Sequence, residues 1–104
     1  MPVANKRLSI EIDRAMSLIN KDAINPLIPE LSIKDIEPIM ELVAKARGEY
    51  IKELCNITKE FGDKQPLPEH VKKLKAKRKV FEEFISAYQA LDTAIERGYL
   101  DVKI

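Results

Sequence analysis

Two long stripes of apolar residues, each advancing in alternating steps of three and four, limit the possible folds of this chain more than any other feature. The first stripe runs through residues 36–61 and the second through residues 68–97. An α-helix turns once every 3.6 residues, so this spacing places each stripe along one face of a helix. Gly62 ends the first stripe and Pro68 opens the second. Because two helices joined by so short a turn must run in opposite directions, the sequence predicts a long antiparallel helical hairpin.

The turn also sets which positions of the two helices face each other. It pairs Tyr50 with the region of Phe81, and the residues nearer the open end follow in the same register. Acidic residues of the first helix are then expected to face the basic start of the second; these are Glu49, Glu53 and Glu60. At the beginning of the first hairpin helix, Asp35 is the preferred N-cap because Pro38 then falls in the first turn; Ser32 is the alternative.

The segment before the hairpin is harder to interpret. Residues 8–12 alternate apolar and polar as a strand would, but the apolar pattern continues beyond them only with helical spacing. We therefore predict a short helix over residues 9–20 and leave a strand at 8–12 as the alternative. Two prolines interrupt residues 20–35, which we predict to be a connector. The whole chain, residues 1–104, is expected to form a single all-α domain.

The hairpin stripes are wider than the seam between two helices requires. An apolar surface in excess of the seam needs cover, and the simplest cover is a two-fold dimer that forms a four-helix bundle. The alternative is a monomeric three-helix bundle with the connector in the groove. The residues predicted to form an interface between chains are Met40, Val43, Phe84, Ile85, Tyr88, Leu91 and Ile95.

One charged segment suggests a different partner. The chain has 104 residues and a net charge of +1, so the whole protein has no strong attraction for nucleic acid. The exception is a basic run at residues 72–79, whose possible phosphate contacts are Lys72, Lys73, Lys75, Lys77, Arg78 and Lys79. No aromatic side chain interleaves the run for base stacking. Nucleic-acid binding through this run is therefore the second functional hypothesis.

The sequence carries no pattern that points to catalysis, a cofactor or a metal site. Its single cysteine, Cys55, and single histidine, His70, lack the partners that a zinc or di-iron site would need. No apolar run reaches the roughly 20 residues that cross a bilayer, and a lone cysteine suits a reducing compartment such as the cytoplasm. We expect a non-catalytic interaction module, an adaptor or small accessory subunit that self-associates or docks on a larger protein; a small all-helical enzyme is the third hypothesis.

Overall fold

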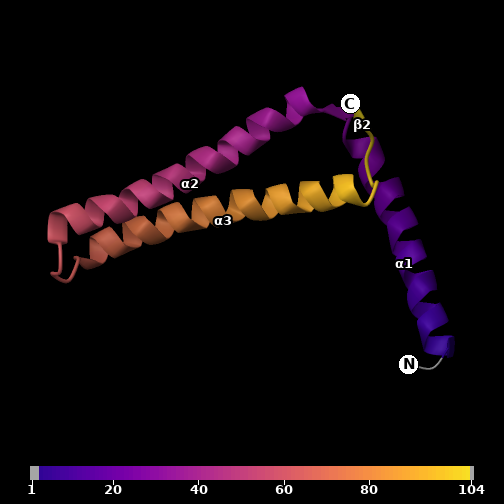
Figure 1. Ribbon diagram of the computed structural model, residues 1–104, viewed down its shortest axis with the longest axis horizontal. Helices are drawn as coiled ribbons and strands as arrows, with labels where there is room; N and C mark the ends of the chain where they lie inside the picture. The colour runs from indigo at the N-terminus through magenta and orange to yellow at the C-terminus, as the bar shows by residue number, and fades with distance from the viewer. Residues whose placement is uncertain (1–2, 104) are drawn as a thin grey trace. The chain divides into compact units, whose positions relative to one another are not determined.

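The computed structural model describes residues 3–103 and is mostly helical (Figure 1). The helices are α1 (Val3–Ile24), α2 (Ile33–Phe61) and α3 (Pro68–Glu96), with a short 3₁₀ turn, η1 (Asn25–Leu27), after α1. Two short strands, β1 (Leu31–Ser32) and β2 (Val102–Lys103), complete the order of elements. The predicted all-α class and the two long hairpin helices are confirmed.

The chain divides into two compact units. One consists of residues 36–90, which are the greater part of α2 and α3 with the turn between them. The other combines the residues up to 35 with those from 91 onward. The predicted single domain thus contains two separate groups of packed residues, and each is described below by itself.

The hairpin unit is held together by the predicted apolar seam. Val43, Ala46 and Ile57 of α2 are buried along it. Tyr50 stacks on Phe81 across the seam, with ring centroids 6.2 Å apart, which confirms the predicted register. Because Gly62 has a φ of 60°, a region that side chains other than glycine rarely adopt, the chain can leave α2 there and turn back.

The second unit is centred on the end of α3. Ala94, Tyr99 and Leu100 form its buried core, around which partly buried residues pack; these are Ile24, Ile28, Leu31, Leu91 and Ile95. Helix α3 ends before Gly98, whose φ is 73°, and two backbone hydrogen bonds close this end of the helix. The Tyr99 N–H donates to the Ala94 carbonyl at 2.8 Å and the Gly98 N–H to the Ile95 carbonyl at 3.1 Å. This is the Schellman pattern, and it turns Tyr99 back onto the core.

The structure differs from the sequence prediction before the hairpin. The first helix spans Val3–Ile24 where residues 9–20 were expected, and residues 8–12 are helical, so the strand alternative is wrong. The predicted connector, residues 20–35, contains the end of α1, η1, β1 and the first turn of α2. Leu31 pairs in parallel with Val102, and Ser32 with Lys103. Two-residue strands carry too little periodic pattern to be read from a sequence.

The preferred N-cap is also wrong. Helix α2 begins at Ile33, so Ser32 occupies the N-cap position and Asp35 lies in the first turn. The Ser32 backbone N–H donates to Asp35 Oδ2 at 2.9 Å, and the Ser32 hydroxyl donates to the same oxygen at 3.0 Å. Asp35 therefore reaches back to the cap, as the acid of a capping box does. Pro38 then lies inside the helix, where its missing N–H leaves one helical hydrogen bond unformed.

Candidate interaction surface

The hairpin unit has two flanks, one on each side of the seam between α2 and α3. Ion pairs that cross the seam line one of them, near the turn. Lys77 Nζ lies 3.6 Å from Glu49 Oε2, Lys73 Nζ lies 3.6 Å from Glu53 Oε2, and His70 Nε2 lies 3.5 Å from Glu60 Oε2. We call this side the polar flank. The expectation that acids of α2 face the basic run of α3 is confirmed for Glu49 and Glu53, whereas Glu60 meets His70, just before the run.

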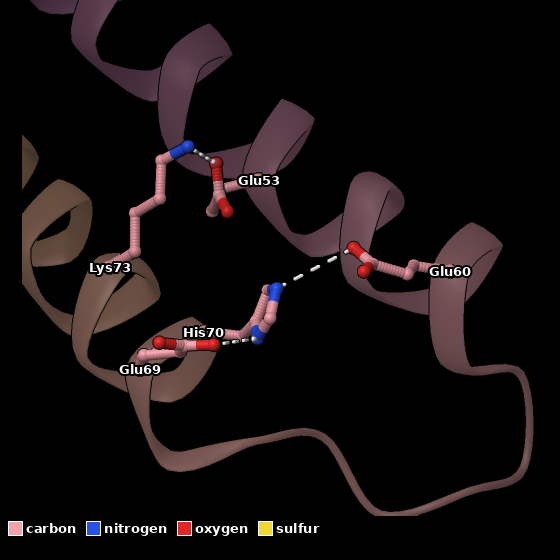
Figure 2. A network of polar contacts seen from close by, with 5 residues as sticks. All are labelled: Glu53, Glu60, Glu69, His70 and Lys73. Atoms are coloured by element: carbon pink, nitrogen blue, oxygen red, sulfur yellow. Dashed lines mark ion pairs between the residues drawn. The ribbon is translucent and has the colours of Figure 1, made fainter.

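Glu53 is the most buried member of the polar flank. Figure 2 shows its carboxylate meeting the tip of Lys73, which reaches across from α3. The Glu53 side chain is 9% exposed, whereas that of Lys73 is 63% exposed. A carboxylate withdrawn from water depends on its partner for stabilisation, so this pair is a structural contact of the hairpin.

His70 lies beside the turn, among groups of both helices. Its ring contacts Phe61 edge to face, with centroids 4.8 Å apart. Figure 2 shows its two ring nitrogens directed toward Glu60 and Glu69, and Nδ1 lies 4.0 Å from Glu69 Oε1. Nδ1 is buried and has no hydrogen-bond partner among the described residues. The His70 side chain is thus largely enclosed, at 24% exposed.

The other side, which we call the apolar flank, carries apolar side chains that the hairpin covers only in part. Its α2 residues follow one helical stripe, and its α3 residues follow a second stripe along the same side of the seam. The apolar flank consists of Met40, Ala44, Ile51 and Leu54 from α2 and Val71, Leu74 and Ile85 from α3. Ile51 and Leu54 are each about half exposed, at 53% and 51%. Exposed apolar residues gathered along one face are typical of a contact surface.

A shallow hollow opens at the end of the apolar flank farther from the turn. Met40, Val43 and Ala44 line it from α2, and Ile85 and Tyr88 line it from α3. Arg47 also borders the hollow, and its guanidinium lies over the Phe81 ring at 5.2 Å from the centroid. A cation is attracted to the face of an aromatic ring, which holds the guanidinium in place. Arg47 is exposed, so it offers a charged group beside the apolar hollow.

The predicted interface residues fall into three places. Met40, Ile85 and Tyr88 meet at the hollow of the apolar flank, whereas Val43 beneath them is only 7% exposed. Phe84 lies on the other side of the seam, where it borders a second hollow with Leu42 and Val80. Ile51 and Leu54 were not among the predicted interface residues, although their spacing of seven and ten from Ala44 places them on the same side of the helix.

The remaining two predicted interface residues belong to the second unit. Leu91 and Ile95 are partly buried against the core formed by Ala94, Tyr99 and Leu100. These two side chains are therefore already partly covered by packing within the chain. Sequence reasoning could not separate them from Tyr88 because all three continue the same helical stripe.

The basic run is divided by the turns of α3. Lys73 and Lys77 face the acids of α2, and Arg78 pairs with Glu82 on its own helix at 3.6 Å. Lys72, Lys75 and Lys79 follow one another at steps of three and four on the outer side of α3, away from the seam, and all three are exposed. No ion pair involves these three lysines within residues 3–103.

Three further observations concern the described residues only. No helix among them is long and apolar enough to cross a membrane. No group of three or more His, Cys, Asp or Glu side chains in this part of the chain is arranged to hold a metal ion. Cys55 is exposed and free.

Comparison with known proteins gives no relative from which a function could be transferred. No protein-family model, no curated protein and no solved structure matches this chain. The function is therefore inferred from its own residues.

Proposed function

We propose that this chain is a non-catalytic helical interaction module that binds another protein chain through the apolar flank, with a second copy of itself as the simplest partner. The observation that carries the proposal is the row of half-exposed aliphatic side chains, above all Ile51 and Leu54, along one side of the hairpin. Fully burying an aliphatic side chain of this size contributes roughly 1.5 to 3 kcal/mol.

The two flanks differ in a way that favours one docking side. The polar flank has its carboxylates and ammonium groups paired across the seam, as with Glu49 and Lys77. The apolar flank has no acid among its named members; of the cations along it, Arg47 rests on Phe81, and Arg78, which follows Leu74 on the α3 stripe, pairs with Glu82. Burial against another chain costs least where few charged groups lose water, so we propose the apolar flank as the contact side.

A second copy fits this surface by symmetry. In a two-fold dimer each chain offers the same surface, so the apolar flank meets an identical flank. Two hairpins joined in this way form a four-helix bundle, in which helices pack around an apolar centre. Docking of the same flank on a larger protein, as an adaptor or accessory subunit, follows the same physical argument. We propose a cytoplasmic location for the module because a free, exposed Cys55 suits a reducing compartment.

Sedimentation velocity at micromolar concentration tests the proposal with the full chain. Wild-type protein is expected to sediment as a dimer or larger, and Ile51→Glu is expected to shift it to a smaller species because a carboxylate would be buried in the interface. Asn56→Glu is the matched control, since Asn56 is an exposed residue of the same helix away from the apolar flank. Circular dichroism verifies that both variants remain helical.

The sedimentation results either support or contradict association through the apolar flank. A smaller assembly in Ile51→Glu than in the wild type, with the wild-type assembly retained in Asn56→Glu, supports the proposal. A wild-type chain that is helical and monomeric at these concentrations contradicts self-association, and so does an Ile51→Glu variant that assembles like the wild type.

Nucleic-acid binding remains the second candidate. The observation in its favour is the exposed row Lys72, Lys75 and Lys79, which presents three ammonium groups on one side of α3. Such a row can contact phosphates without reading sequence. Against it, Lys73, Lys77 and Arg78 of the same run already pair with carboxylates.

A further inference from the structure

Helix α1 is attached to its own unit by one face only. Near its C-terminal end, the Asn20 side chain, and to a smaller extent that of Ser17, lies near enough to the Tyr99 hydroxyl to lower its pKa, and Ile24 packs on the core beside Tyr99. These three residues are spaced by three and four, so they lie on one side of the helix. Asn20 and Ile24 are also the residues of α1 that are partly buried, whereas residues 4–19 and 21–23 are exposed.

The main apolar stripe of α1 lies on a different side. It follows the helical repeat through Leu8, Ile12, Ala15 and Ile19, with Met16 at its edge. At 100° per residue, the stripe is centred well over a quarter-turn from the side that holds Ser17 and Asn20. Leu8, Ile12 and Ile19 are all more than half exposed, at 59%, 53% and 61%. The packing within the unit therefore leaves the stripe uncovered.

We propose that α1 pairs with α1 of a second copy of this chain, the two helices running antiparallel with their stripes in contact. The stripe has the alternating three- and four-residue steps that coiled coils use for their seam. An antiparallel register places Leu8 opposite Ile19 of the other copy and Ile12 opposite Ala15. The two-fold axis repeats both pairs, which makes four apolar layers.

The residues that bound the stripe favour the antiparallel direction over the parallel one. Asp22 continues the stripe after Ile19, and Asn5 continues it before Leu8. In a parallel pair, Asp22 would face the Asp22 of its partner, and like charges in contact destabilise a helix pair. In the antiparallel register each Asp22 faces an Asn5, whose amide can donate a hydrogen bond to the carboxylate. The small Ala15 also meets the larger Ile12 in each central layer.

The charges of α1 favour a protein helix over a lipid surface as the occupant. Helices that lie on membranes are rich in Lys and Arg on their polar face and carry Trp, Phe or Leu on the other. Helix α1 has nearly balanced charge and no aromatic residue; its bases are Lys6, Arg7, Arg14 and Lys21, and its acids are Glu11, Asp13 and Asp22. Arg14 and Glu11 already pair with each other at 3.2 Å.

A matched pair of substitutions in the full chain tests this contact by sedimentation velocity. In an Ile51→Glu background, where the apolar flank no longer associates, Ile12→Glu places a carboxylate in a central layer and is expected to reduce the fraction that still assembles at least tenfold. Ile10→Glu is the control, because Ile10 is equally exposed, at 51% against 53%, but lies off the stripe. Equal assembly of the two variants would overturn the proposal. The α1 pair rests on self-association, as the proposed function does, but it uses a different surface. Ile51→Glu tests the apolar flank and Ile12→Glu tests the α1 pair, so either proposal can be contradicted while the other stands.

Thiol cross-linking then determines whether the two α1 helices run antiparallel or parallel. In a Cys55→Ser background, Leu8→Cys combined with Ile19→Cys is expected to give a covalent dimer with a short bifunctional maleimide, because the two positions face each other across the copies. Leu8→Cys alone is expected to stay monomeric on a denaturing gel, since an antiparallel pair separates the two Leu8 positions by about 16 Å along the helix axis. A cross-linked dimer from Leu8→Cys alone would show a parallel pair, and no cross-link from the double variant would show no pair; either result contradicts the proposal.

Discussion

Lys73 and Glu53 form an ion pair across the hairpin in which the two partners differ in solvent exposure, 63% for the lysine side chain and 9% for the glutamate. Lys77 and Glu49 form a second pair at the same distance, 3.6 Å, but there the glutamate is 52% exposed. The two pairs occupy successive turns of the same two helices, which makes each a reference for the other.

Removing the lysine of each pair is expected to have unequal effects. Lys73→Ala leaves a buried carboxylate without its partner and is expected to lower the free energy of unfolding by about 1 to 2 kcal/mol, after allowing for the solvent that reaches Lys73. Lys77→Ala is expected to cost under about 0.5 kcal/mol, because its carboxylate is hydrated in either state. Urea unfolding followed by circular dichroism measures both, and equal losses would contradict the role given to burial.

Glu53→Leu tests the same idea from the other side. In the Lys73→Ala background it removes the unpartnered charge and replaces it with an apolar side chain, so it is expected to restore most of the lost stability. If the double variant is less stable than Lys73→Ala alone, Glu53 makes a favourable contact that its pair with Lys73 does not explain. The measurement is again the urea midpoint.

Two glycines of α2 are expected to respond in opposite directions to alanine. Gly48 lies in the middle of the helix with open space around its Cβ position, so Gly48→Ala should raise stability by about 1 kcal/mol. Gly62 also has open space, but its φ of 60° strains any side chain, so Gly62→Ala should lower stability by about 1 to 2 kcal/mol. Thermal unfolding measures both, and shifts of the same sign would contradict the turn geometry.

Asp35 is expected to make the free energy of unfolding depend on pH in the acidic range. The hydrogen bond from the Ser32 backbone N–H, followed by the one from its hydroxyl, lowers the pKa of the Asp35 carboxyl below its ordinary value of 3.8. Because the folded pKa lies below the unfolded one, this contribution to stability is complete above the unfolded pKa and is lost as the pH falls through the folded pKa. Carbon-detected NMR titration of Asp35 measures the shift directly.

Ser32→Ala provides the control for that titration. It removes the hydroxyl donor and keeps the backbone donor, so the Asp35 pKa should rise only part of the way toward 3.8. Asp35→Asn should weaken the acid dependence of stability over the same range of pH. A Ser32→Ala variant whose Asp35 titrates as in the wild type would contradict the cap observed at the start of α2.

Nucleic acid is expected not to bind at about 0.1 M salt, where counterions screen a row of three lysines. An electrophoretic shift with mixed DNA and RNA fragments checks this. A shift abolished by Lys72→Gln, Lys75→Gln and Lys79→Gln together, but unchanged by Lys77→Gln, would promote the nucleic-acid hypothesis over protein binding.

The hairpin could be predicted because its signals are local and repeated. The apolar steps of α2, the stop at Gly62 and the start at Pro68 each follow from backbone geometry within a few residues. The stack of Tyr50 on Phe81 followed in turn from the length of the loop. The position of the cap was wrong because Ser32 and Asp35 both suit it, and the choice depends on a hydrogen bond between them.

The periodic helices, the hairpin direction and its register are thus properties of the amino-acid order, because each rests on contacts between near neighbours or on one short loop. Which apolar residues stay exposed had to come from packing. Leu91 and Tyr88 continue one stripe, yet Leu91 lies against the Tyr99 core whereas Tyr88 borders the open hollow. The difference arises because the chain after Gly98 folds back and β2 pairs with β1, which places Tyr99 against Leu91. These contacts join residues far apart in the chain, so no periodic pattern in the sequence indicates them.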